Sequence, residues 1–142
     1  MIFIDTSAWY ALLTEKDIHR PEAEEFFAEI GKGHFGAPLT TDYVLDETFT
    51  LLRLRGGVTA VRRLADLLRR SPTVRRVRIS EAAFEAGLDM IVSHADKKWS
   101  FTDCTSFVTM RDAGVSRAFT LDRNFAEAGF EILPQEWAKP LE

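Results

Sequence analysis

Short apolar runs alternate with longer amphipathic segments along the chain, and this alternation constrains the fold more than any other feature of the sequence. Residues 2–5, 74–79, 117–122 and 130–133 are predicted to form strands, and another strand is expected near His34–Pro38. Segments of helical length separate these runs. Strands that alternate with helices favour an α/β fold, with a mostly parallel sheet and helices on both of its faces.

Capping and helix-breaking residues mark where the intervening helices begin and end. Residues 6–14 are predicted to be helical, Pro21 lies just inside a second helix, and Thr40 or Thr41 caps a long helix that ends at Gly56–Gly57. Three more helices are expected over residues 58–70, from Ser80 to about His94, and from Ser100, whose spacing from Asp103 matches a variant of the capping box.

The length and composition indicate one globular domain over residues 1–142, because no linker, repeat or low-complexity segment divides the chain. The single cysteine, Cys104, excludes an internal disulfide framework and fits a reducing cytoplasm. No run approaches the roughly 20 apolar residues of a membrane span, and we expect no signal peptide, because no basic region precedes the apolar start and Asp5 interrupts it. We therefore expect a cytoplasmic protein with no membrane partner.

Positive charge is concentrated in one segment of an acidic chain. Residues 53–78 contain nine arginines and one acid, a net charge of +8, whereas the whole chain carries −4 and the remainder therefore −12. Such a basic segment can hold a polyanion, although arginines on exposed helix faces would give the same pattern. The candidates for contact with RNA or an acidic protein are Arg53, Arg55, Arg62 and Arg63.

Three aspartates occur where predicted strands end or a helix begins. Asp5 ends the first strand, Asp122 ends the strand over residues 117–122, and Asp103 lies in the first turn of a helix. In parallel α/β folds these positions face the same edge of the sheet, where ligands bind. Taken singly, Asp5 or Asp103 could instead cap a helix and Asp122 could stabilise a turn.

Glu47 is the candidate on the long helix, in preference to its neighbour Asp46. A carboxylate with apolar neighbours on its own side of a helix is costly to bury unless an arginine or a cation compensates its charge. The apolar neighbours expected on the side of Glu47 are Tyr43, Val44, Leu51 and Leu54.

Four converging carboxylates would repel one another, and a divalent metal ion would relieve that repulsion. All-oxygen ligands favour Mg²⁺ or Mn²⁺, whereas His19, His34 and His94 show no zinc-ligand spacing with Cys104. A cation held by carboxylates suits phosphodiester chemistry, because it activates water and offsets charge on the phosphoryl group.

At these residues the chain resembles the PIN-domain nucleases, specifically the VapC-like toxins of prokaryotic toxin–antitoxin modules. The segments that carry the resemblance are IDTSA, DIHRPEA, TTDYVLDETFTLL, SFTDCTSFVTMRDAG and AFTLDRNFAEAGFEIL. The order and spacing of the four acids in them make the resemblance fairly specific.

The resemblance implies a three-layer α/β/α sandwich, Mg²⁺- or Mn²⁺-dependent cleavage of single-stranded RNA, a homodimer and a cognate antitoxin protein. Asn124 is a departure, because many relatives carry an acid or histidine there. Carried over by position, the metal-binding and catalytic residues are Asp5, Glu47, Asp103 and Asp122, and the residues that line the site are Thr6 and Thr120.

Two other interpretations of the acids remain open on the sequence. A metal-dependent phosphatase of the haloacid-dehalogenase type would require an aspartate where Ser7 stands. An inactive PIN-like scaffold that binds RNA or protein would be expected to have lost one or more acids. The aromatic residues Trp9, Tyr10 and Trp99 could stack on bases, but core or dimer packing is the favoured interpretation, and Cys104 is expected in the core.

Overall fold

A parallel five-stranded sheet forms the centre of the molecule, in the strand order β3-β2-β1-β4-β5. The structure is a computed structural model that describes residues 1–139, so residues 140–142 of the expected domain lie outside the described part. The prediction of a mostly parallel α/β sheet is confirmed. The strands are β1 (Ile2–Ile4), β2 (Pro38–Thr41), β3 (Arg75–Val77), β4 (Arg117–Phe119) and β5 (Glu131–Leu133).

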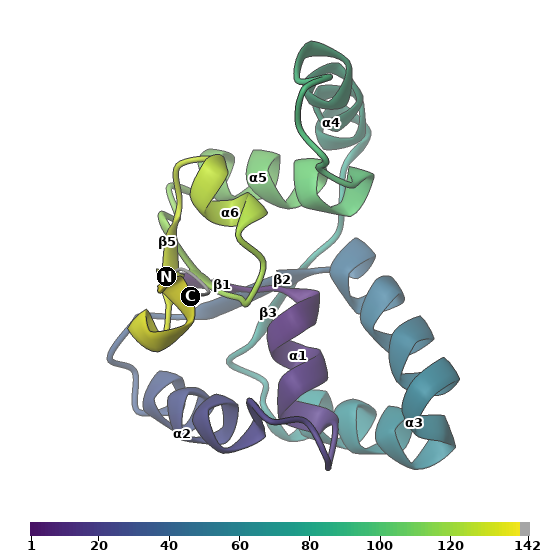
Figure 1. Cartoon of the computed structure of the whole chain (residues 1–142), viewed down its shortest axis with the longest axis vertical. Helices are drawn as coiled ribbons and strands as arrows, with labels where there is room; N and C mark the ends of the chain where they lie inside the picture. Colours follow the sequence, from purple (N-terminus) through teal and green to yellow (C-terminus); the bar gives the residue numbers. More distant parts are fainter. Residues whose placement is uncertain (140–142) are drawn as a thin grey trace.

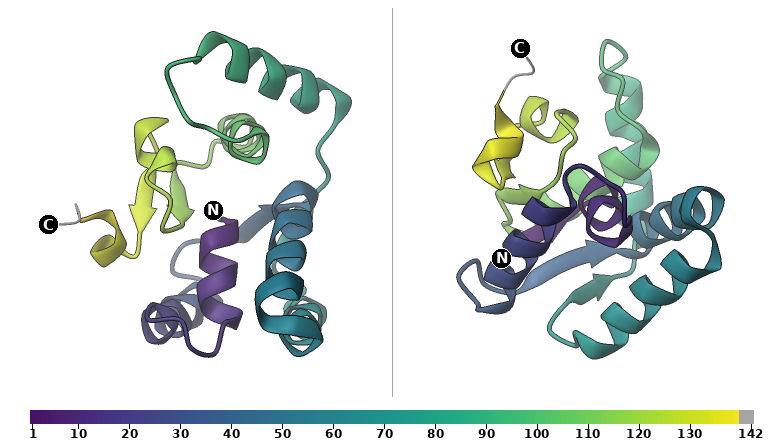
Figure 2. Two further views of the ribbon diagram at one scale, coloured as in Figure 1. Left: turned by 45° about the vertical axis from the view of Figure 1, so that its right-hand side comes forward. Right: turned by 60° about the horizontal axis from the view of Figure 1, so that its bottom comes forward.

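Helices cover both faces of this sheet, which gives the expected three layers. Figures 1 and 2 show α1, α2 and α3 on one face and α5 and α6 on the other, with α4 packed outside α5. None of the helices in residues 1–139 has the length and apolar character needed to cross a membrane. The helices are α1 (Thr6–Leu13), α2 (Arg20–Gly31), α3 (Asp42–Arg70), α4 (Glu81–Ser93), α5 (Phe101–Ala113), α6 (Asn124–Glu127) and the 3₁₀ helix η1 (Gln135–Ala138).

The strand expected near His34–Pro38 was wrongly placed, because β2 begins only at Pro38. A turn precedes it, in which the amide of Gly36 donates to the carbonyl oxygen of Gly33 at 3.2 Å. Gly36 has a φ of 73°, a left-handed conformation that interrupts an extended chain.

The two threonines at the end of β2 have different roles, which the sequence left undecided. Thr41 caps α3, since its hydroxyl accepts from the amide of Val44 at 3.1 Å. Thr40 belongs to the sheet, and its hydroxyl donates to the carbonyl oxygen of Ile4 at 3.0 Å.

The long segment α3 is two helices joined at a kink, as the sequence predicted from Gly56–Gly57. Gly57 has φ 74° and ψ −170°, which is not helical, and both flanking segments keep the helical form. After the kink, the arginine-rich second half passes the lower end of α1 and leads into β3 (Figure 1). All four arginines that were predicted to contact RNA or a partner are exposed on α3.

The apolar first strand positions the site by running through the core. Ile2, Phe3 and Ile4 are fully buried, and each such side chain contributes about 1.5–3 kcal/mol to folding. Cys104 is also fully buried, and burial, followed by the charge of Asp103, raises the pKa of its thiol to about 11. The prediction that this cysteine is a core residue is confirmed.

Candidate active site

The four predicted acids line one cavity at the carboxyl ends of β1 and β4. The cavity has a volume of about 250 Å³, and α1, α3 and α5 form its other walls. The sequence placed these four side chains at one edge of the sheet, and the structure brings them together there. They are Asp5, Glu47, Asp103 and Asp122.

Asp5 occupies the N-cap position of α1, but its side chain makes no capping hydrogen bond. Its Oδ2 instead accepts from the hydroxyl of Thr120 at 2.8 Å and from that of Ser7 at 3.2 Å. The side chain is only 4% exposed. The alternative that Asp5 is a simple helix cap is therefore wrong.

Burial dominates the acid–base properties of Asp5. The pKa of its carboxyl group is raised from 3.8 to about 7, with desolvation by burial as the largest cause. The charges of Asp103 and Asp122 contribute to this rise, and the hydrogen bonds from the Thr120 side chain and the Thr6 backbone oppose it. A group with such a pKa is part-protonated at neutral pH unless a cation compensates its charge.

Asp103 and Asp122 serve as local capping or turn residues as well as lining the cavity. Asp103 and Ser100 form a complete capping box at the start of α5, with both hydrogen bonds at 3.0 Å. The backbone amide of Asn124 donates to Oδ1 of Asp122 at 2.9 Å, which forms the predicted turn. Burial, opposed by that amide, raises the pKa of Asp122, and the charges of Asp103, Glu127 and Glu47 raise it too.

Asn124 links these two acids. Its side-chain Nδ2 donates to Oδ2 of Asp103 at 3.0 Å, while its backbone amide holds Asp122. The residue that departs from the usual family pattern thus contacts the site through a neutral amide and orients Asp103.

Glu47 faces the cavity from α3 and is half-buried, whereas Asp46 beside it is exposed. This position agrees with the choice of Glu47, whose role as a ligand stays a prediction. Leu54, one of the apolar residues expected on that side of the helix, is 76% exposed.

The donor set fits a hard divalent cation. Each aspartate of the site uses one carboxylate oxygen for the hydrogen bonds described above, while Oδ1 of Asp5, Oδ1 of Asp103 and Oδ2 of Asp122 accept no side-chain hydrogen bond from residues 1–139. In the described part of the chain, however, no three Asp, Glu, His or Cys side chains are gathered tightly enough to hold a metal as they stand. Binding would therefore require these side chains to draw closer.

Comparison with known proteins identifies the family. The chain matches the PIN domain over residues 2–131. It belongs to the PIN-domain family. It is 35% identical over 136 residues to the 23S rRNA-specific endonuclease VapC20 of Mycobacterium tuberculosis, a match that covers 95% of this chain and 100% of that protein.

Solved structures share the fold of this chain. The crystal structure of VapC20, described as a Sarcin-Ricin loop cleaving toxin, superposes with a TM-score of 0.82 at 34% identity, over 92% of this chain and 96% of that one. FitAcB from Neisseria gonorrhoeae shares the fold at 16% identity, with a TM-score of 0.63 over 93% of this chain and 96% of that one. The predicted VapC-like PIN-domain membership is confirmed.

The two threonines predicted to line this PIN-domain site differ in their contacts. Thr120 is fully buried, and its hydroxyl donates to Asp5. Thr6 lines the cavity, but its hydroxyl lies 3.4 Å from the carbonyl oxygen of Val44 and contacts no carboxylate in the described residues.

Ser7 is the supporting residue that the sequence analysis missed. Its hydroxyl donates to Asp5, lies 3.1 Å from the Thr120 hydroxyl and accepts from the amide of Leu121 at 2.8 Å. The signal was a second hydroxyl residue after the aspartate, but only the pairing of β1 with β4 brings Thr120 and Leu121 to it.

Tyr10 and Arg55 form part of the cavity wall, and the Arg55 guanidinium carbon lies 5.6 Å from the centre of the Tyr10 ring. Arg53, Arg62 and Arg63 are exposed and do not line the cavity. Of the other candidate stacking residues, Trp9 is fully buried, and its indole N–H donates to Thr40 at 3.3 Å, so its interpretation as a core residue is confirmed.

Proposed function

We propose that this protein is a metal-dependent endoribonuclease that cleaves single-stranded regions of RNA, as the toxin of a toxin–antitoxin pair. The observation that carries the proposal is the match to VapC20 along 100% of that protein's length. Four carboxylates around one cavity supply the chemistry that such an enzyme needs. A haloacid-dehalogenase-type phosphatase finds no support in the family comparison.

The acids in our proposal hold Mg²⁺ or Mn²⁺ and form the catalytic set. A divalent cation bound there supplies activation of water and stabilisation of charge on the phosphoryl group. Its positive charge would also keep the buried Asp5 ionised at neutral pH, against the desolvation that raises its pKa. The proposed ligands are Asp5, Glu47, Asp103 and Asp122.

The surrounding residues keep these carboxylates in position and bind the substrate. Thr120 and Ser7 hold Asp5, and the Asn124 amide holds Asp103 without adding charge. Arg55, stacked over Tyr10 in the cavity wall, binds a phosphate next to the cleaved bond. Water attacks phosphorus and the 3′ oxygen leaves, so the product carries a 5′-phosphate.

Arg53, Arg62 and Arg63 extend the binding surface from the cavity along α3. These exposed side chains contact phosphates without reading the bases, so their contribution falls as the salt concentration rises. Arg63 is 4.0 Å from Glu15, an exposed pair that is worth little and leaves the arginine available to RNA.

The proposed substrate is a loop of 23S ribosomal RNA, since VapC20 is named for that RNA and its structure for cleavage of the Sarcin-Ricin loop. The test is cleavage of a synthetic RNA hairpin of that loop, and of a scrambled hairpin, with Mg²⁺, Mn²⁺ or EDTA. We expect metal-dependent cuts with 5′-phosphate ends in the first RNA.

Glu47→Gln and Asp46→Asn form a matched pair for this test, because the two residues are adjacent on α3 but only Glu47 faces the cavity. We expect the first variant to lose cleavage and the second to retain it. Equal cleavage by both would contradict the proposed site. RNA binding without cleavage by the wild type under every metal condition would support the inactive-scaffold alternative.

The proposed partners are a cognate antitoxin protein and a second copy of this chain, acting in the cytoplasm where ribosomes are found. An apolar row on α4 supports a subunit interface: Phe84, Leu88 and Val92 lie four residues apart and are 36%, 39% and 78% exposed. Sedimentation should show a dimer for the wild type and a monomer for Leu88→Glu.

A further inference from the structure

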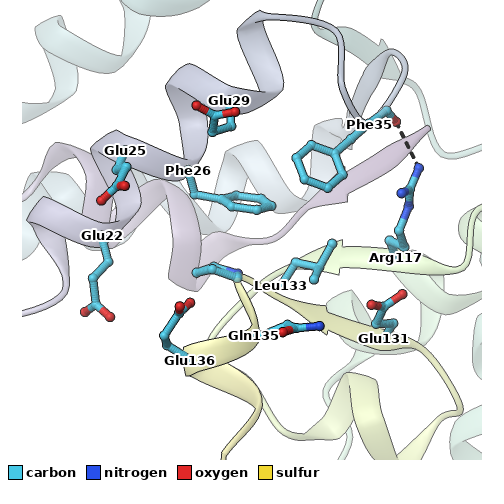
Figure 3. Close-up of a pocket in the computed structure, with 11 residues that line it drawn as sticks. Glu22, Glu25, Phe26, Glu29, Phe35, Arg117, Glu131, Leu133, Gln135 and Glu136 are labelled. Atoms are coloured by element: carbon cyan, nitrogen blue, oxygen red, sulfur yellow. Dashed lines mark hydrogen bonds between the residues drawn. The ribbon is translucent and has the colours of Figure 1, made fainter.

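A second cavity lies between α2 and the segment formed by β5 and η1, and it shares no residue with the candidate active site. Its volume is about 610 Å³, within the usual range for ligand-binding pockets. Figure 3 shows the rings of Phe26 and Phe35 facing Leu133 across it. We call this cavity the α2–β5 groove. It is surrounded by five carboxylates, those of Glu22, Glu25, Glu29, Glu131 and Glu136.

The positive charges near the groove are already engaged. Arg117 donates to the carbonyl oxygen of Phe35 at 3.3 Å, and its guanidinium carbon lies 5.3 Å from the centre of the Phe35 ring. Lys32 and His34 both contact Glu29, at 2.8 and 3.0 Å.

The other groove carboxylates are less compensated. The Glu22 carboxylate lies 3.5 Å from Nδ1 of His19, on the preceding turn. Within residues 1–139, no basic side chain lies within 4.0 Å of the carboxylates of Glu25, Glu131 or Glu136. The groove therefore presents unbalanced negative charge around an apolar floor.

We propose that the α2–β5 groove is a docking site for a basic segment of a protein partner, in which lysine or arginine alternates with apolar residues. The apolar side chains would cover the phenylalanines and Leu133, and the cations would pair with the glutamates on both sides. Charge complementarity of this kind selects the partner and its orientation. Nucleic acid is disfavoured here because its phosphates would meet the same carboxylates.

The position of the groove in the sheet suits an extended segment. β5 is the last strand in the order β3-β2-β1-β4-β5, so one of its edges has no neighbouring strand within residues 1–139. Extended peptides commonly bind beside such an edge and place alternate side chains in pockets. The proposal is independent of the nuclease activity, because no groove residue belongs to the proposed catalytic set.

The test is titration of ¹⁵N-labelled protein with a ten-residue peptide that alternates arginine and leucine, in 50 mM salt. We expect amide shifts at Phe26, Phe35 and Gln135, and none with a peptide that alternates glutamate and leucine. Shifts confined to the catalytic cavity, or no shifts at millimolar peptide, would overturn the proposal. So would equal binding of a peptide that alternates arginine and glycine, because the apolar floor would then contribute nothing.

Two double variants test whether peptide binding depends on the carboxylates of the groove. Glu25→Gln combined with Glu136→Gln removes one exposed carboxylate from each side of the groove, and Glu85→Gln combined with Asp89→Gln removes two exposed acids from α4. We expect the first pair to weaken peptide binding at least about tenfold and the second to leave it unchanged. Equal weakening in both would show only net-charge attraction and would overturn the site. RNA cleavage, unaffected by the groove pair, separates failure here from failure of the proposed function.

Discussion

Two cavities in this protein are lined by carboxylates, but the carboxylates are held in different ways. In the candidate active site, Asp5 is 4% exposed and receives two hydroxyl hydrogen bonds, and burial raises its pKa to about 7. In the α2–β5 groove, Glu25 and Glu136 are exposed on the rim. The number of acids is similar, so the difference lies in desolvation and in the contacts that orient each carboxylate.

The comparison shows what separates a catalytic carboxylate from a docking carboxylate. Acids that are buried close together carry an electrostatic cost, which a bound cation can relieve. Exposed acids around an apolar floor carry little such cost and act through long-range attraction and pairing. Removing an acid should therefore relieve electrostatic repulsion in the active site but only weaken the attraction of a partner in the groove.

The largest effect is expected for Asp103→Asn. We expect RNA cleavage to fall at least about a thousandfold, at the upper end of the loss seen when one preorganised polar group is removed from an active site. The change keeps the size of the side chain that caps α5, so the fold should persist. Initial cleavage rates measure the effect, with Asp112→Asn, an exposed acid on the same helix, as the control. A less than tenfold loss would separate Asp103 from the chemistry.

The next effect is the pH dependence of stability in the metal-free protein. Asp5 has a folded-state pKa near 7 and an unfolded value near 3.8, so between these pH values the folded state binds more protons. Its contribution must therefore decrease as pH rises from about 4 to 7, by up to about 1.4 kcal/mol per pH unit.

Urea unfolding in EDTA at several pH values, for the wild type and Asp5→Asn, measures this contribution. Asp5→Asn should lack this part of the pH dependence. Its stability relative to the wild type should therefore be higher at pH 7 than at pH 4. Asn can still accept the hydrogen bonds from Thr120 and Ser7 through its side-chain oxygen. The same pH dependence in both proteins would mean that Asp5 is ionised without metal and that other groups of the protein compensate its negative charge.

Divalent metal should stabilise the active-site region and leave the groove unaffected. Because the cation binds only the folded arrangement, Mg²⁺ at about 100 times its Kd should add about 2.7 kcal/mol and raise the Tm by several degrees. Asp103→Asn should reduce this rise, whereas the combined Glu25→Gln and Glu136→Gln variant should keep it. Thermal unfolding with and without EDTA gives the values. A rise that only the groove variant loses would place the cation in the groove.

The smallest effect is expected at the missed residue Ser7. Ser7→Ala removes one of the two hydroxyls that hold Asp5, while Thr120 still donates at 2.8 Å. Loss of such a supporting contact to a ligand costs roughly 10- to 100-fold in activity, and we expect about tenfold because Thr120 remains. Cleavage rates for Ser7→Ala, Thr120→Val and the double variant measure it. Unchanged activity in the double variant would show that Asp5 needs neither hydroxyl.

The sequence by itself determined the order of strands and helices, the parallel sheet and the four acids at one edge. The physical reason is local: a buried strand requires an unbroken apolar run, as in Ile2–Ile4, and a helix start requires a capping residue, as at Ser100. Parallel strands then place every strand end on a known edge. The choice of Glu47 over Asp46 also followed from helix periodicity.

The tertiary structure alone decided which residues support those acids and where the second cavity lies. Ser7 and Thr120 are 113 residues apart and meet only because β1 pairs with β4. Leu54 is 76% exposed although it shares a side of α3 with Glu47, because helix periodicity does not say which part of a helix side other elements cover. The α2–β5 groove joins glutamates of α2 to glutamates of β5 and η1, about 100 residues later in the chain. Contacts of this kind depend on how the helices and strands pack against one another. A local pattern of residues does not predict that packing.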